Sequence, residues 1–369
     1  MAMIKNPKLT REQIFFCTFL GIIGNIVYIH TWISNDTNRA SWLASFAGIL
    51  AIIPFVLWLL YLSKFNPEGT IFDTIKQGIG KLPNYLLCII FIILNICISA
   101  THLNMFAEML RVFVFQNTPA PVFMFIMVLI VLLILNSDII TTCKLIEVLT
   151  VIGLINYFSC FIFAFPKMIN IKYIIPIFDT SIPNLLYGLI FITSASSELL
   201  FFLMVIVSNI PDPFKHRSWV ISGIISSAIV FSLAILIIIA MMSPEIAKRI
   251  AFGGVNAARL ISVGSYIYGL EILVIGTYQF IALGKIMICM YCSWISLKKI
   301  LGEKRPKLQL TFASLALYIT ALLLNSYTKS YFFAVFLGRY ILLPFSILVL
   351  ILASISLKIR RNKTGSVAK

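Results

Sequence analysis

The chain contains ten stretches of mostly apolar residues, each close to or above the about 20 residues that an α-helix needs to cross a bilayer. They lie at 12–34, 40–63, 84–112, 119–136, 139–165, 184–208, 217–242, 266–297, 308–327 and 331–357. Only 11% of the residues are charged, whereas a soluble domain has about 25%. So few charges cannot cover a water-facing surface. We therefore expect an all-α integral membrane protein with ten transmembrane helices, and the composition argues against a soluble globular enzyme.

Lysine and arginine are distributed unevenly over the connections between these stretches. With the N-terminus in the cytoplasm, 19 of the 29 Lys and Arg residues fall in inner segments, nine in outer segments and Lys285 within a span. Cytoplasmic loops of membrane proteins carry such an excess. The asymmetry predicts an even number of spans with both termini inside, and it explains the net charge of +16 without a nucleic-acid partner.

Two glycines and an asparagine interrupt the first stretch near its middle. Gly21, Gly24 and Asn25 lie in an otherwise apolar run, and glycine weakens a helix by about 1 kcal/mol relative to alanine. One interpretation is local unwinding at the middle of the membrane. The other is a face of small residues that lets a neighbouring helix approach closely.

The sixth stretch carries three hydroxyls and a carboxylate about 14 residues from its start. Ser194, Ser196 and Ser197 precede Glu198 in an apolar run, and serine side chains compete for backbone hydrogen bonds within helices. An ionisable group in hydrocarbon costs roughly 2.5–3.5 kcal/mol on insertion scales. We therefore expect Glu198 to act in gating or coupling, the alternative being a protonated carboxyl that is hydrogen-bonded between helices.

The two interruptions fall in corresponding spans if the chain consists of two five-helix halves. The chain 1–369 is then one polytopic membrane domain, with a first repeat at about 12–165 and a second at about 184–357. Paired interruptions in corresponding positions are typical of transporters whose binding site lies at the membrane midplane. This pattern predicts broken helices one and six, with a polar site between them.

The eighth stretch carries three polar residues at heptad spacing. Glu271, Tyr278 and Lys285 lie seven residues apart, so they follow one stripe of a helix that drifts about 20° per heptad. Lys285 lies too far from either end to reach the interface easily. We expect an acidic partner on a neighbouring helix, either Glu198 or Glu147, in a transport role or in a structural ion pair.

The third stretch has its own polar stripe. Thr101, Asn104, Glu108 and Arg111 recur at helical spacing, and Glu108 and Arg111 are close enough in sequence to pair. Thr101 and Asn104 are deep enough to border a central cavity. His102 lies off that stripe and is expected to be a hydrogen-bonded contact between helices.

The ends and connections of these helices also have recognisable signals. Thr10 and Gln13 predict a capping box at the start of the first helix, and 136–138 predicts a tight turn. The connection 64–83 contains an apolar-periodic stretch, Ile71–Ile75, that is expected at the cytoplasmic interface. The connection 243–265 is long enough for an outer lid.

The sequence gives no support to enzyme chemistry. It has three histidines, no phosphate-binding loop and no cluster of metal-ligand spacing. Cys289 and Cys292 form a C-x-x-C pair, but they lie in an apolar helical run without a second pair. We therefore expect a binding protein that needs no metal or cofactor.

The chain resembles the spore germination permeases, the B subunits of spore germinant receptors, which are related to the amino acid, polyamine and organocation transporters. The resemblance covers essentially the whole chain. It rests on the ten spans, on the opening Leu9–Gln13, on Ser196–Leu200 in the sixth span, and on Glu271 followed by Lys285 in the eighth.

The resemblance implies a leucine-transporter-type fold of two inverted five-helix repeats in the inner membrane of a bacterial endospore. It also implies a complex with a larger A subunit and a C-subunit lipoprotein, and a role in sensing an amino acid or similar nutrient and triggering ion release. A proton- or sodium-coupled amino acid permease is the alternative, and a subunit that only scaffolds its partner is a third. The sequence departs from the family at Lys144 and Tyr278, where arginine and tryptophan are usual.

The predicted pocket lies between spans one, three, six, eight and ten. Its expected ligand-binding residues are Gly21, Gly24, Asn25, Thr101, Asn104, Ser194, Ser196, Ser197 and Tyr278. Its expected gating or coupling residues are Glu198, Lys285, Glu271 and Glu147.

Overall fold

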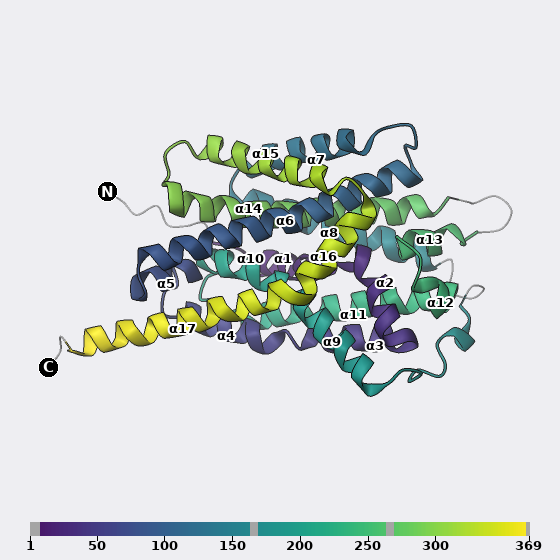
Figure 1. The fold of residues 1–369 in the computed structure, drawn as a ribbon, viewed down its shortest axis with the longest axis horizontal. Coiled ribbons are helices and arrows are strands. Elements are labelled where there is room, and N and C mark those ends of the chain that lie inside the picture. Colours follow the sequence, from purple (N-terminus) through teal and green to yellow (C-terminus); the bar gives the residue numbers. More distant parts are fainter. Residues whose placement is uncertain (1–7, 163–168, 263–268, 367–369) are drawn as a thin grey trace.

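Helices form the regular secondary structure of the computed structural model, which describes residues 8–162, 169–262 and 269–366. Most of the long helices run along the long axis of the molecule (Figure 1). Within the described residues, eight helical segments are long and apolar enough to cross a bilayer, so the chain is a multi-pass membrane protein. These segments are Ile29–Ser63, Lys81–Phe113, Ile139–Ile162, Ile182–Asn209, Arg217–Met242, Glu271–Leu301, Pro306–Leu324 and Tyr327–Asn362.

The number of segments differs from the ten predicted. The first predicted span begins with a helix of only 13 residues, α1 (Arg11–Ile23), and its second half joins the second predicted span in one segment. The fourth is α7 (Ala120–Leu135), which has 16 residues. Positions 163–165 and 266–268 of two predicted spans lie outside the described residues. The all-helical membrane class is confirmed, whereas the count of ten and the five-plus-five repeat stay predictions.

The first predicted interruption lies at Gly24 and Asn25, between α1 and α2 (Ile26–Thr37). It is short: the Gly24 N–H donates to the Leu20 carbonyl and the Asn25 N–H to the Ile22 carbonyl, both at 3.2 Å. The second of these bonds spans three residues, as in a 3₁₀ turn. The helix is therefore tightened over two residues and not unwound over a long stretch.

The second predicted interruption is a single residue, Ser197, between α9 (Ile182–Ser196) and α10 (Glu198–Ile206). The Ser197 N–H donates to the Ser194 carbonyl at 3.0 Å, and the Leu200 N–H donates to the Ser197 carbonyl at 2.8 Å. Both bonds span three residues. Glu198 therefore begins a new helical segment in the buried interior, where its carboxylate lies close to the interruption.

The centre of the bundle is built on α14 (Glu271–Leu301), a continuous helix of 31 residues. It packs against α6 (Lys81–Phe113) along much of its length and against α8 (Ile139–Ile162). On the other side of α1, α11 (Arg217–Met242) completes the packing. The two interrupted helices thus lie among long continuous ones.

The remaining α-helices include further parts of the spanning segments and the short helices α5, α12 and α13 between them. They are α3 (Ser41–Leu50), α4 (Ile53–Ser63), α5 (Ile71–Gly78), α12 (Pro244–Ala247), α13 (Gly253–Arg259), α15 (Pro306–Leu324), α16 (Tyr327–Phe336) and α17 (Leu342–Ser366). Figure 1 shows α5 and the end of α17 at one end of the molecule, and α12 and α13 at the other.

Three local predictions about the connections can be compared with the structure. The capping box of α1 is present, because the Gln13 N–H donates to Thr10 Oγ1 at 3.3 Å and Gln13 Oε1 accepts from the Thr10 N–H at 2.9 Å. The turn 136–138 joins α7 directly to α8. The stretch Ile71–Ile75 is helical, but its apolar face is buried against α17 and α6, so it packs on protein.

Candidate functional site

A buried ion pair joins the second half of an interrupted helix to the central helix. The Lys285 ammonium on α14 lies 2.6 Å from Oε2 of Glu198 at the start of α10, and the two side chains are only 2% and 4% exposed. The Lys285 ammonium also donates to the carbonyl oxygen of Gly21 on α1. Three elements therefore meet at one cation, next to both interruptions. Of the two acidic partners proposed from the sequence, Glu198 is the one that Lys285 contacts.

Glycines on α1 make room for this pair. A β-carbon on Gly24 would lie 3.0 Å from Cδ of Lys285, and one on Gly21 would lie 3.1 Å from Cδ1 of Leu199. Contacts this short force a neighbour to move. These contacts fit the small-residue interpretation of the first stretch, because the glycines let α1 approach Lys285 and Leu199 closely.

A histidine completes the buried cluster. His102 on α6 places Nε2 at 4.0 Å from Oε2 of Glu198, and its side chain is 2% exposed. The helical stripe drawn through Thr101 and Asn104 had excluded this residue. The position of His102 in the sequence could have identified it, because an ionisable side chain 21 residues into a long apolar helix needs a polar neighbour.

The two interruptions contact each other directly. Asn25 Nδ2 donates to the Ala195 carbonyl at 3.1 Å, which links the break after α1 to the end of α9. Ser197 Oγ donates to the Ser194 carbonyl at 2.6 Å, and Ser196 is buried beside them. Among the described residues, the buried Asn25 Oδ1 and Ser194 Oγ have no hydrogen-bond partner. Because buried polar atoms are normally paired, these two atoms retain unused hydrogen-bonding capacity beside the interruptions.

Two residues of the third predicted span make other contacts. Thr101 Oγ1 donates within its own helix to the Ile98 carbonyl at 2.7 Å. Asn104 Nδ2 donates to the Ala321 carbonyl on α15 at 3.3 Å. Both side chains are buried, and neither of these two hydrogen bonds is made to Glu198 or Lys285. The structure therefore brings His102 to Glu198 and directs Asn104 to α15.

The rest of the polar stripe on α14 extends toward the N-terminal end of this helix. Tyr278 is buried against α13, where a β-carbon on Gly254 would lie 2.2 Å from its hydroxyl oxygen. Glu271 lies 3.6 Å from the guanidinium of Arg259. Glu147 is half-buried on α8. Among these residues, only Lys285 belongs to the cluster around Glu198.

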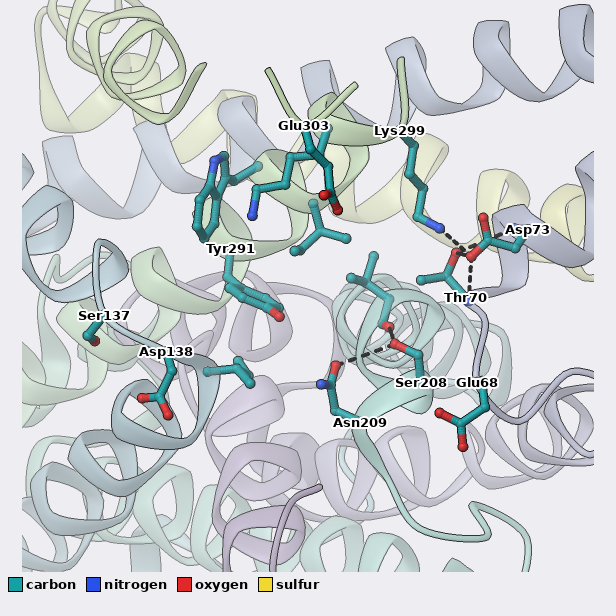
Figure 2. Close-up of a pocket in the computed structure, with 15 residues that line it drawn as sticks. Glu68, Thr70, Asp73, Ser137, Asp138, Ser208, Asn209, Tyr291, Lys299 and Glu303 are labelled. Carbon is teal, nitrogen blue, oxygen red and sulfur yellow. Dashed lines mark hydrogen bonds and ion pairs between the residues drawn. The ribbon is translucent and has the colours of Figure 1, made fainter. Parts of the chain in front are cut away.

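A cavity of about 580 Å³ lies near the C-terminal end of α14, on the same helices (Figure 2). Tyr291 on α14 lies six residues beyond Lys285, and Val205 on α10 lies seven beyond Glu198, so the cavity wall is about 10 Å along each helix from the ion pair. The turn between α7 and α8 adds Asp138. The cavity and the buried cluster therefore share α10 and α14 but are separated along them.

An ion pair between α5 and α14 lies at the edge of this cavity. Figure 2 shows the Lys299 ammonium directed at the Asp73 carboxylate, which also accepts hydrogen bonds from the N–H and hydroxyl of Thr70. Burial raises the pKa of Asp73, but attraction to Lys299 and the hydrogen bonds outweigh burial and hold the pKa below its usual value. Asp73 therefore ties α5 to the C-terminal end of α14 as a carboxylate.

No group of three His, Cys, Asp or Glu side chains suited to a metal ion occurs among the described residues. The arrangement suits ligand binding: a cation, a carboxylate and an imidazole are buried together with two polar atoms that have no partner in the described part of the chain.

Comparison with known proteins shows which protein family the chain belongs to. The family described as "Spore germination protein" matches residues 8–330. Spore germination protein B2 of Bacillus subtilis (strain 168) is 26% identical over 222 residues, which is 58% of this chain and 58% of that protein. The match thus spans less than two thirds of the relative's length. Because the family match covers most of the sequence, the chain belongs to the spore germination protein family.

Proposed function

We propose that the chain is the B subunit of a spore germinant receptor and binds an amino acid or similar small nutrient at the two helix interruptions. The observation that carries the proposal is the buried pair between Glu198 and Lys285 beside Asn25 and Ser194. Membership of the spore germination protein family supports the receptor role.

The chemistry of an amino acid matches this cluster. Its carboxylate can replace Glu198 on the Lys285 ammonium, and its ammonium group can bind the released Glu198 carboxylate. The oxygens of Asn25 and Ser194 offer further acceptors. A zwitterion therefore exchanges one internal ion pair for two ion pairs with the ligand. Such an exchange favours a conformation in which the two helices have separated, and a ligand shifts an equilibrium only through such a difference in affinity.

The wider arrangement follows from the same proposal. The chain has ten spans in two inverted halves, about 12–165 and 184–357, with both termini on the core side of the inner spore membrane. It assembles with an A subunit and a C-subunit lipoprotein, and nutrient binding leads to ion release through the assembled receptor. The remaining predicted pocket residues, Thr101, Asn104 and Tyr278, support the walls of the pocket.

Spores that carry Glu198→Gln test the proposal. We expect the nutrient-triggered loss of refractility and release of ions to be abolished or sharply weakened, while Glu245→Gln, an exposed residue on α12, responds normally. An immunoblot of the spore membrane checks that both variants are present. A normal response of a membrane-resident Glu198→Gln variant contradicts the proposal.

A proton- or sodium-coupled amino acid permease is the second candidate. It is favoured by the proximity of His102 to the ion pair, since an imidazole can carry a proton between buried charged groups. Vesicles that contain this chain alone separate the two functions. Accumulation of labelled amino acid against a gradient supports the permease, whereas binding without accumulation supports the receptor.

A further inference from the structure

A groove of about 520 Å³ lies between the ends of α4 and α17. Its lining residues do not include Glu198 or Lys285. The two helices are in contact and lie side by side in Figure 1. Lys64 directly follows α4, and the last turns of α17 carry Lys358, Arg360, Arg361 and Lys363, so the positive-inside rule places the groove at the inner surface of the membrane. Its volume is in the range of about 300–1,000 Å³ that small-molecule sites occupy.

One half of the groove is aromatic and apolar. Trp58 forms part of the wall, and its indole N–H donates to Ser354 Oγ at 3.1 Å, which fixes the ring between the helices. Tyr61 and Phe65 follow toward the end of α4, with side chains 49% and 45% exposed and ring centroids 5.5 Å apart. Tryptophan and tyrosine are enriched where hydrocarbon meets headgroups.

The other half is cationic. Lys358, Arg360 and Arg361 follow Leu357 on α17, and all three are exposed. Arg360 donates to Gln77 on α5 at 2.8 Å, so its guanidinium is oriented by the protein. Three positively charged side chains of the groove therefore lie next to an apolar wall.

We propose that this groove binds an anionic glycerophospholipid of the inner leaflet. The phosphate lies among the three cations, and the upper part of an acyl chain packs against Trp58 and Leu357. A zwitterionic lipid has the same acyl chains but no net charge, so the cations discriminate against it. Basic pockets at the cytoplasmic side of membrane helices bind anionic headgroups in this way. An acidic segment of a protein would match the charges but not the apolar wall beside them.

Native mass spectrometry of the purified full chain tests the proposal. The chain is exposed to phosphatidylglycerol and phosphatidylcholine with identical acyl chains, and the bound lipids are counted. We expect the native chain to retain phosphatidylglycerol preferentially. The triple variant Lys358→Gln, Arg360→Gln, Arg361→Gln should lose that preference, by about fivefold for each charge removed.

The matched control removes three cations from another inner connection, in the triple variant Lys304→Gln, Arg305→Gln, Lys307→Gln. This variant should retain phosphatidylglycerol as the native chain does. Equal losses in the two triple variants would mean that the total positive charge attracts the lipid, and would overturn the proposal. Retention of phosphatidylglycerol by the groove variant would overturn it as well.

Two further measurements locate the lipid and identify its source. Brominated phosphatidylglycerol should quench a larger share of the tryptophan fluorescence in the native chain than in the Trp58→Phe variant. The difference between the two quenched fractions reports contact of the lipid with Trp58 in the groove. Excess inorganic phosphate should leave the lipid bound, because a free ion lacks the apolar part. Displacement by phosphate alone, or equal quenching of the two proteins, would contradict a lipid site.

Discussion

Removal of either charge of the buried pair is the most informative perturbation of this chain. Glu198 and Lys285 are 2.6 Å apart, and at an effective dielectric constant of about 20 their attraction is roughly 6 kcal/mol. Transfer of each charge from water costs several kcal/mol, so the net stabilisation of the pair is small. A single neutralisation differs, because it leaves the other charge buried without a counterion.

We therefore expect Glu198→Gln and Lys285→Met each to lower the free energy of unfolding by about 3–5 kcal/mol. The double variant should recover most of this loss, since it buries no charge. Thermal unfolding of the purified protein in detergent measures all four members of this double-mutant cycle. The same double variant should fail to respond to nutrient in spores, which separates the role of the pair in function from its role in folding.

Two results would refute this reasoning. If Glu198→Gln alone is as stable as the native chain, Lys285 does not depend on that carboxylate. If the double variant is stable and still responds to nutrient, the pair is a structural link between α10 and α14 and has no part in the response.

Three other perturbations have expected outcomes. Gly24→Val should destabilise the chain by about 1–3 kcal/mol in thermal unfolding, because its side chain must displace the stem of Lys285; unchanged stability would contradict the close packing. Asn25→Leu should cost about 1–2 kcal/mol in the same assay, because it removes a buried hydrogen bond between the interruptions, and nutrient affinity should fall with it. The lowered pKa of Asp73 stabilises the fold above the pKa of the unfolded carboxyl, about 3.9, and this stabilisation is lost as the pH falls through the folded pKa. The unfolding temperature of the native chain should therefore decrease below about pH 4 with a component that Asp73→Asn lacks; identical pH profiles would exclude a role for the pair with Lys299.

The cost of burying charge made much of the site predictable from sequence. That cost indicated that Lys285 needs an acidic partner, and it reduced the candidates to Glu198 and Glu147. The choice between these two depends on how α8 and α10 pack around α14, which no local pattern encodes. Both interruptions were predictable because glycine and clustered serine weaken a helix locally, but the number of residues they disturb was not.

The sequence indicated that His102 needs a polar neighbour, but it could not identify Glu198 as that neighbour or predict the cavity. The rotation of a helix about its axis decides whether residue 101, 102 or 104 faces the centre, and a helix that is apolar on all sides gives little information about that rotation. The cavity is lined by segments from four parts of the chain, around residues 70, 138, 208 and 295. Only the assembled fold brings them together.

The central helix α14 carries the lysines of two ion pairs, Lys285 with Glu198 and Lys299 with Asp73. Lys285 and Lys299 are 14 residues apart on this uninterrupted helix, about 21 Å along its axis. A rigid rod of this length that pivots by 5° moves its far end by about 2 Å. Such a movement is comparable to the length of a hydrogen bond. The uninterrupted helix therefore connects the surroundings of the buried Glu198–Lys285 pair to the contact between Lys299 and Asp73 on α5.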